Sequence, residues 1–286
     1  MTRTTSSARR ARHAPYDLAG TLTALVVGLG ALGVAATAAQ DPAPAPDGRI
    51  SLDGPSQPLG GGTMRTYLEM LDGVPVAVGV ALSEDALEGL PDEGAHMRHL
   101  DLEHAHALAR EWVLELPTPN PTPYTHVSFN WNPAGHEPQD VWTHPHFDFH
   151  FNIITDAERR TITPDNPHWK EREARAPRAE LMPAGYVSAE MAVPLMGVHW
   201  IDPTTPELHG ETFTQTFIFG AWDGKLIFAE PMITKAFLQS KPDFEAALPL
   251  PAEVEKPGYY PTSYAIRWNE EAREYRVSLE GLVEVR

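Results

Sequence analysis

The segment from Val141 to Ile154 reads Val-Trp-Thr-His-Pro-His-Phe-Asp-Phe-His-Phe-Asn-Ile-Ile. Side chains on a β-strand alternate between its two faces, so His144, His146, Asp148 and His150 share one face and phenylalanines line the other. A row of imidazoles and a carboxylate is costly to bury unless water, hydrogen bonds or a metal ion satisfy it. The pattern therefore predicts a divalent-metal site on a strand whose other face is buried, and it fits Zn, Fe, Mn or Ni equally well.

One strand cannot supply a whole coordination shell. Residues two apart on one face are about 7 Å apart and residues four apart about 13 Å, so the other ligands must come from neighbouring strands. His199 lies in a strand-like run, and Glu230 lies at the predicted end of another strand, just before Pro231. We predict these metal ligands: His144, His146, His150, His199 and Glu230.

Two carboxylates are predicted to do the chemistry if the site is catalytic. A metal ion would polarise a substrate oxygen or activate water, and Asp148 or Glu230 would act as the general base. Asp148 has a second possible role, as a metal ligand or as the acceptor that fixes an imidazole tautomer. The alternative for the whole row is a polar strand satisfied by hydrogen bonds and water.

Other histidines give weaker signals. His126 lies on a strand-like segment, and the turn-rich loop after it carries His136 and Glu137, which could fold over the mouth of the site. A further group lies near a predicted helix over residues 102–116, of which residues 113–116 could equally be a strand. A solvated helix surface explains this group as well as a site does. Its members are His96, His99, His104 and His106.

Composition limits the chemistry further. The 286 residues include 28 Pro and no Cys, and the formal net charge is −17. Without cysteine the chain has no disulfide, no thiolate nucleophile and no Cys-ligated metal, so any metal is held by His, Asp and Glu. The acidic balance predicts no nucleic-acid partner, because phosphate binding needs a basic surface.

The first 39 residues have the pattern of an export signal. Four arginines precede an apolar stretch over residues 18–39, which ends in Ala36-Thr37-Ala38. We expect residues 1–39 to be a signal peptide or an uncleaved N-terminal anchor, which would be the chain's only contact with a membrane. Residues 40–63 are rich in Pro and Gly and predict a flexible linker, so residues 64–286 would form a periplasmic or extracellular domain.

Short alternating segments separated by turns predict a mainly β fold, with α+β as the alternative. Asp72-Gly73 separates two such segments, Trp222-Asp223-Gly224 marks another turn, and residues 269–273 are predicted to close a final hairpin. We expect a single antiparallel β-barrel-like domain with short helices, whose inner polar face carries the histidine-rich site.

Several motifs resemble an exported bacterial family of unknown function, typified by a Thermus protein from an extracytoplasmic sigma-factor and anti-sigma-factor operon. The most specific is His146-Phe-Asp-Phe-His150, and the others lie at residues 131–138, 196–200, 224–233 and 258–261. The resemblance implies an exported, stress-related protein with no established reaction.

The sequence thus leaves three hypotheses open. The first is a divalent-metal site, catalytic or not, that accepts a small-molecule ligand or substrate. The second is a non-enzymatic barrel that binds a small organic ligand as a carrier or sensor. The third is a structural envelope protein that forms a homo-oligomer.

Overall fold

The computed structural model describes residues 48–93 and 108–286. Nearly all regular structure in them is antiparallel β-strand, and the helices are single turns or little more. The strands are β1 (Arg49–Asp53), β2 (Gln57–Leu59), β3 (Gly62–Leu71), β4 (Val74–Ser83), β5 (Arg110–Glu115), β6 (His126–Asn132), β7 (His146–Asn152), β8 (Val187–Val193), β9 (Gly197–Ile201), β10 (Gln215–Trp222), β11 (Lys225–Thr234), β12 (Asp243–Ala247), β13 (Gly258–Tyr260), β14 (Ser263–Asn269), β15 (Glu274–Glu280) and β16 (Val283–Val285). The helical turns are η1 (Glu84–Leu87), α2 (Asp156–Arg159), α3 (Trp169–Glu173), η3 (Ala179–Leu181), η4 (Pro206–His209) and α4 (Lys235–Gln239).

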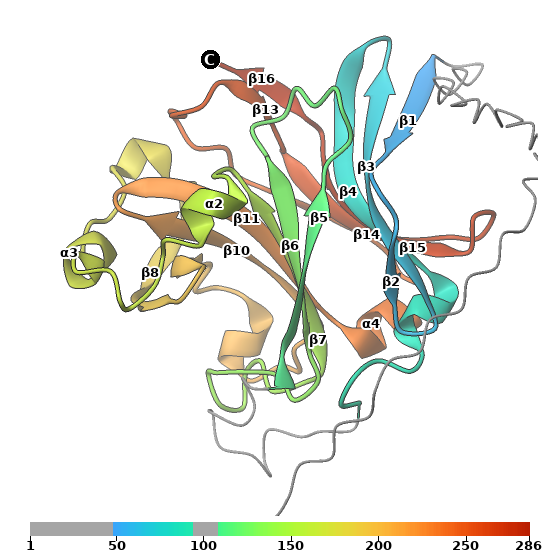
Figure 1. Cartoon of the computed structure of the whole chain (residues 1–286), viewed down its shortest axis with the longest axis horizontal. Coiled ribbons are helices and arrows are strands. Elements are labelled where there is room, and N and C mark those ends of the chain that lie inside the picture. Colours follow the sequence, from blue (N-terminus) through green and yellow to red (C-terminus); the bar gives the residue numbers. More distant parts are fainter. Residues whose placement is uncertain (1–47, 94–107) are drawn as a thin grey trace, which may run out of the picture. The chain divides into compact units, whose positions relative to one another are not determined.

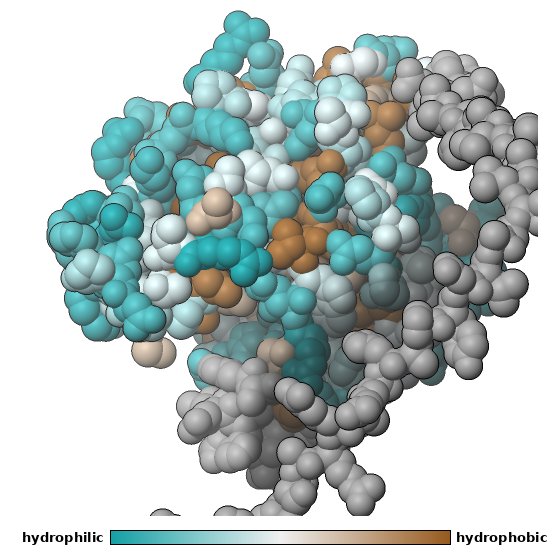
Figure 2. All heavy atoms as spheres, in the orientation of Figure 1, coloured by the Kyte–Doolittle hydropathy of each residue, from teal (hydrophilic) through white to brown (hydrophobic). Residues whose placement is uncertain are grey.

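Two seven-stranded sheets carry the fold (Figure 1). Sheet A has the order β1-β3-β4-β15-β14-β12, with β2 paired to β3, and sheet B has the order β5-β6-β7-β11-β10-β9-β8. β13 and β16 form a separate two-stranded sheet. The face in Figure 2 is mainly hydrophilic, as the large negative charge leads one to expect.

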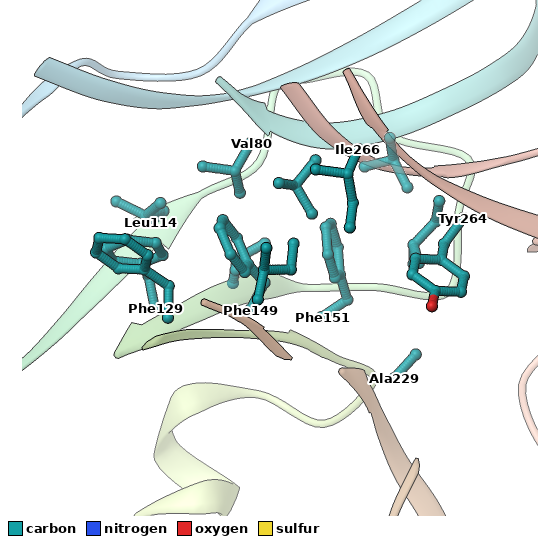
Figure 3. Close-up of a cluster of buried hydrophobic side chains, with 14 of the residues drawn as sticks. Val80, Leu114, Phe129, Phe149, Phe151, Ala229, Tyr264 and Ile266 are labelled. Carbon is teal, nitrogen blue, oxygen red and sulfur yellow. The ribbon is translucent and has the colours of Figure 1, made fainter. Parts of the chain in front are cut away.

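The main core lies between the two sheets. Figure 3 shows Val80 and Ile266 of sheet A directed toward Phe149 and Phe151 of sheet B. The buried phenylalanines of β6 and β7 also pack on one another, with ring centroids 5.0 Å apart for Phe129 and Phe149. Burying an aromatic side chain of this size stabilises a fold by roughly 1.5–3 kcal/mol relative to exposure, so this core accounts for the position of β7.

The expected barrel with an inner polar face is wrong in two respects. Both sheets are open, with β1 and β12 at the edges of sheet A and β5 and β8 at the edges of sheet B. The face of β7 that enters the core between the sheets carries phenylalanines, and the histidines lie on its other face. Alternation along a strand shows that one face is buried, but it does not show whether the sheet closes on itself or packs on a second sheet. The mainly β, antiparallel class with short helices is confirmed.

Several local expectations differ from the structure. Residues 49–59 form β1 and β2, with Leu59 buried, so the ordered part begins before the expected boundary at residue 64. β5 (Arg110–Glu115) agrees with the strand alternative for residues 113–116 and begins three residues earlier, within the predicted helix. β11 continues through Pro231 to Thr234. The hairpins at Asp72-Gly73 and at residues 269–273 form as predicted.

Some expectations lie outside the described residues. These are the leader at 1–39, the start of the linker, and the group of His96, His99, His104 and His106. Among the residues that the structure describes, no helix is long and apolar enough to cross a membrane.

The second face of sheet B, which we call its outer face, is also covered. At one end of this face Phe228 packs with Trp169 of α3 and with Ile162. At the other end Ile218 and Met232 pack with Trp142 and Phe213 from two loops. The outer face therefore has an apolar cluster at each end, and polar side chains lie between them.

Candidate metal centre

The candidate site is built on β7, both faces of which are buried. Phe147, Phe149 and Phe151 enter the main core, so period-two alternation places the even-numbered residues on the outer face. Glu230 joins them from β11 and His199 from β9. Two groups of three side chains result, each with its donor atoms within 4.8 Å of one another.

We define site 1 as His136, His146 and Asp148. The Nε2 atom of His146 lies 3.2 Å from Oδ1 of Asp148, and Nε2 of His136 lies 3.9 Å from Oδ2. The side chain of Asn132 on β6 donates a 2.6 Å hydrogen bond to the same Oδ2. Asn132 is the register partner of His146 on β7, and Asp148 lies two residues further along β7 on the same face, so this contact runs diagonally across the strand pair.

We define site 2 as His150, His199 and Glu230. The Nε2 atom of His150 lies 3.2 Å from Oε1 of Glu230, and Nε2 of His199 lies 3.7 Å from Oε2. His199 reaches this group from β9, across Gly220 of β10, with which it is paired.

Backbone carbonyls hold three of the four imidazoles. Nδ1 of His146 lies 2.7 Å from the carbonyl oxygen of His144, and Nδ1 of His136 lies 2.8 Å from that of Glu137. Nδ1 of His150 lies 3.3 Å from the carbonyl of Ser128. A carbonyl only accepts, so Nδ1 carries the proton in each ring and Nε2 is the atom left to bind a metal.

The atoms at the centre of both sites have no hydrogen-bond partners. Among the described residues, the buried side-chain atoms without a partner include Nε2 of His146, Oδ1 of Asp148, Nε2 of His150 and Oε2 of Glu230. Leaving a buried polar atom unpaired costs about 1–3 kcal/mol. A metal ion between each imidazole and its carboxylate would satisfy these atoms, so the donors present fit a divalent cation.

Burial and neighbouring charge shift the pKa values in both sites. Burial lowers the pKa of His136, His150 and His199, the last to about 3, which keeps these imidazoles neutral. Burial by itself would raise the pKa of Asp148, but the nearby histidines, led by His146, hold it well below its ordinary range. Neutral imidazoles are the form that binds metal.

Asp148 of site 1 and Glu230 of site 2 differ in charge. Burial, with the Asp148 charge as a second cause, raises the pKa of Glu230 well above its ordinary value. Asp148 is therefore ionised, whereas Glu230 favours the protonated form in the absence of a cation.

Glycines shape both ends of the centre. A side chain at Gly220 would collide with the Phe228 ring at 2.1 Å, so the glycine makes room for that ring. The Phe228 ring contacts both His150 and His199, at centroid distances of 4.8 and 5.6 Å. In the loop before β7, Gly135 has φ +72° and no room for a Cβ, and it directs His136 toward site 1.

The structure divides the predicted ligand set. His146 belongs to site 1, while His150, His199 and Glu230 form site 2; no three of the predicted histidines converge on one point. His144 joins neither site: it is exposed and precedes the strand, because the ladder begins at His146 after Pro145. Asp148 and Glu230, predicted as general bases, each lie among the donor atoms of a site.

From the sequence, His136 is predicted only as a residue of the loop that could cover the site. Its place in site 1 depends on the fold of residues 133–145, and its sequence signal is the turn chemistry of Asn132-Pro-Ala-Gly.

His126 forms no part of either site. It is buried at the other end of the same polar face, and its Nδ1 lies 2.9 Å from the Thr125 hydroxyl. The nearby Arg159 is fully buried and makes paired hydrogen bonds of 2.8 Å to Glu111. This network stabilises the junction between α2 and sheet B.

Residues 72–131 match the TTHB210-like family, described as "Hypothetical protein TTHB210". The match confirms the resemblance to an uncharacterised family over the segment from the β3–β4 turn into β6. It ends before β7 and so does not include the donor residues of sites 1 and 2. No curated protein and no solved structure matches the chain.

Proposed function

We propose that this protein binds divalent metal ions at sites 1 and 2. The observation that supports the proposal is a set of four buried ligand atoms, two in each site, that have no hydrogen-bond partners among the described residues. Each site offers two imidazole nitrogens and one carboxylate, which leaves coordination positions open for water or a small-molecule ligand. Zn, Fe(II), Mn and Ni all accept such a set.

An open position on a bound metal permits catalysis. The ion would polarise a substrate oxygen or lower the pKa of bound water. Asp148 and Glu230 would then be ligands, or would take a proton from the water if the ion is held mainly by the histidines.

Elemental analysis of tag-free protein tests metal binding directly. We expect about two ions per chain in the parent and about one in either His146→Ala or His150→Ala, because each change removes a buried ligand from one site only. His168→Ala is the matched control, since His168 is exposed and lies in neither site. Less than about 0.1 ion per chain, with no uptake on reconstitution, would overturn the proposal.

Asn132→Leu tests the orienting contact to Asp148. The change keeps the side-chain size but removes the 2.6 Å hydrogen bond. Loss of such an outer partner weakens metal affinity by about 10–100-fold. We expect this loss of metal affinity at site 1 alone. Competition with a chelating dye measures it, and the unchanged affinity of site 2 serves as the internal reference.

We also propose that the chain is exported, as its first 39 residues predict. Fractionation of cells that produce the full chain, followed by sequencing of the mature N-terminus, distinguishes a cleaved signal peptide from an anchor. Recovery of the intact chain in the cytoplasm would contradict export.

A further inference from the structure

Sites 1 and 2 are direct neighbours on one strand. Asp148 of site 1 and His150 of site 2 are alternate residues of β7 and face the same side, which places their Cα atoms about 7 Å apart. On β11, Glu230 of site 2 is two residues from Met232, the register partner of Asp148. The two sites thus lie side by side in one layer on the sheet.

Charges act across the boundary between them. The Asp148 charge acts to raise the pKa of both His150 and Glu230, and the His136 charge acts to lower the pKa of His199 in site 2. An ion in one site would therefore strongly influence an ion in the other, because the effective dielectric constant of a buried region is low.

The sites do not hold enough negative charge for two divalent ions. Each has one carboxylate, and an imidazole is neutral once it binds a metal, so two dications would leave a net charge of about +2. Glu137 is the further acid that acts on His136, and counting it still leaves a positive excess. The other nearby charges balance, since Arg159 and Arg160 lie against Glu111 and Asp156.

Each of the two sites has one partly exposed ligand. The ligands on β7 and β11 are buried, whereas the side chains of His136 and His199 are 23% and 16% exposed. Each site therefore has one ligand in contact with solvent, His136 in site 1 and His199 in site 2.

We propose that ions in sites 1 and 2 act as one two-ion centre that binds a small oxyanion at their open coordination positions. The inference rests on the proposed metal binding and adds the class of ligand. An oxyanion supplies both the missing negative charge and oxygen atoms that two adjacent ions can share. Phosphate supplies more charge than a monocarboxylate, so it is expected to bind more tightly.

Electron paramagnetic resonance of the Mn²⁺-loaded protein tests the two-ion centre. We expect a spectrum broadened by coupling between neighbouring ions, which changes when inorganic phosphate is added. His136→Ala and His199→Ala each empty one site through a partly exposed ligand, and both should give the six-line spectrum of an isolated ion.

Phosphate affinity, measured by calorimetry on the same samples, tests the oxyanion. We expect binding at least about tenfold weaker in His136→Ala and His199→Ala than in the parent, weaker binding of acetate, and no change in the His168→Ala control. Two bound ions with isolated spectra, or phosphate binding that is absent or as strong in the metal-free protein, would overturn the inference while leaving metal binding intact. A protein that takes up no metal would overturn both proposals.

Discussion

The two faces of β7 are equally buried and chemically opposite. On the inner face Phe147, Phe149 and Phe151 are 0% exposed and pack ring against ring in the main core. On the outer face His146 and His150 are 0% and 1% exposed, yet their Nε2 atoms have no hydrogen-bond partner in the described part of the chain. Burial stabilises the first face, whereas on the second it removes water from polar atoms without replacing it.

The difference indicates what each face is for. Packing in the main core is sufficient to explain why Phe149 is buried. Buried polar atoms that have no partner among the described residues still need an explanation, such as a bound ion or an ordered water. The inner face thus positions the strand, and the outer face displays donors on a rigid element, the arrangement that precise ligand geometry requires.

Truncation of the inner face should have the largest effect on stability. We expect Phe149→Ala to lower the free energy of unfolding by about 3–5 kcal/mol, because it leaves a cavity in a fully buried cluster. Urea denaturation of the metal-free protein measures this loss. His150→Ala, one position along the strand, is the matched variant, and it should cost less because it also removes an unsatisfied atom. Equal losses would contradict the proposed contrast between the faces.

Replacement of polar residues on the outer face by apolar ones should not lower the stability of the metal-free protein, in contrast to Phe149→Ala. In the metal-free protein, His150→Leu combined with Glu230→Leu should be neutral or stabilising by about 1–4 kcal/mol, because well-packed apolar residues replace buried polar groups. Metal uptake should fall by one ion per chain in the same variant. Thermal unfolding with and without metal separates the two effects, and a clear destabilisation of the metal-free form would show that the polar pair itself supports the fold.

The alternation of residues 146–152 predicts which side chains lie on each face of β7. A period of two fixes which side chains share a face whatever the sheet does elsewhere, so the phenylalanine face, the histidine face and the start of the ladder after Pro145 all follow from the sequence. His199 and Glu230 are predicted on other grounds, because one strand cannot supply a whole coordination shell and each of them lies on another strand-like segment; both lie in site 2.

What depends on contacts distant in sequence could not be predicted in this way. The division into two sites arises because Glu230 and His199 meet His150, while a loop brings His136 to His146. The choice of packed sheets over a barrel depends on how β4 and β15 come to lie over β7. The exposure of His144 follows from its position before the strand, where alternation no longer holds.

The smallest expected effect is a pH dependence of stability that comes from His126, at the end of the polar face. Burial and then the Arg159 charge lower the pKa of His126 to about 4, and Asp156 and Glu111 oppose the shift while Arg160 adds to it. The unfolded chain takes up a proton on this histidine below about pH 6.5, but the folded chain does so only below about pH 4. The unfolded state therefore binds more protons in this window, and stability falls as the pH decreases, by up to about 1.4 kcal/mol per pH unit for one histidine.

His126→Gln should remove this contribution. Urea unfolding of the metal-free protein across the same window should show a smaller loss of stability toward acid than in the parent, with no difference near neutral pH beyond a constant offset. The exposed His168→Gln variant should follow the parent. Parallel curves for parent and His126→Gln would mean that His126 is protonated in the folded protein, and that its charge is accommodated by Asp156, whose carboxylate lies 4.0 Å from the ring. That outcome would separate this end of the outer face from sites 1 and 2, where neutral imidazoles are the form that binds metal.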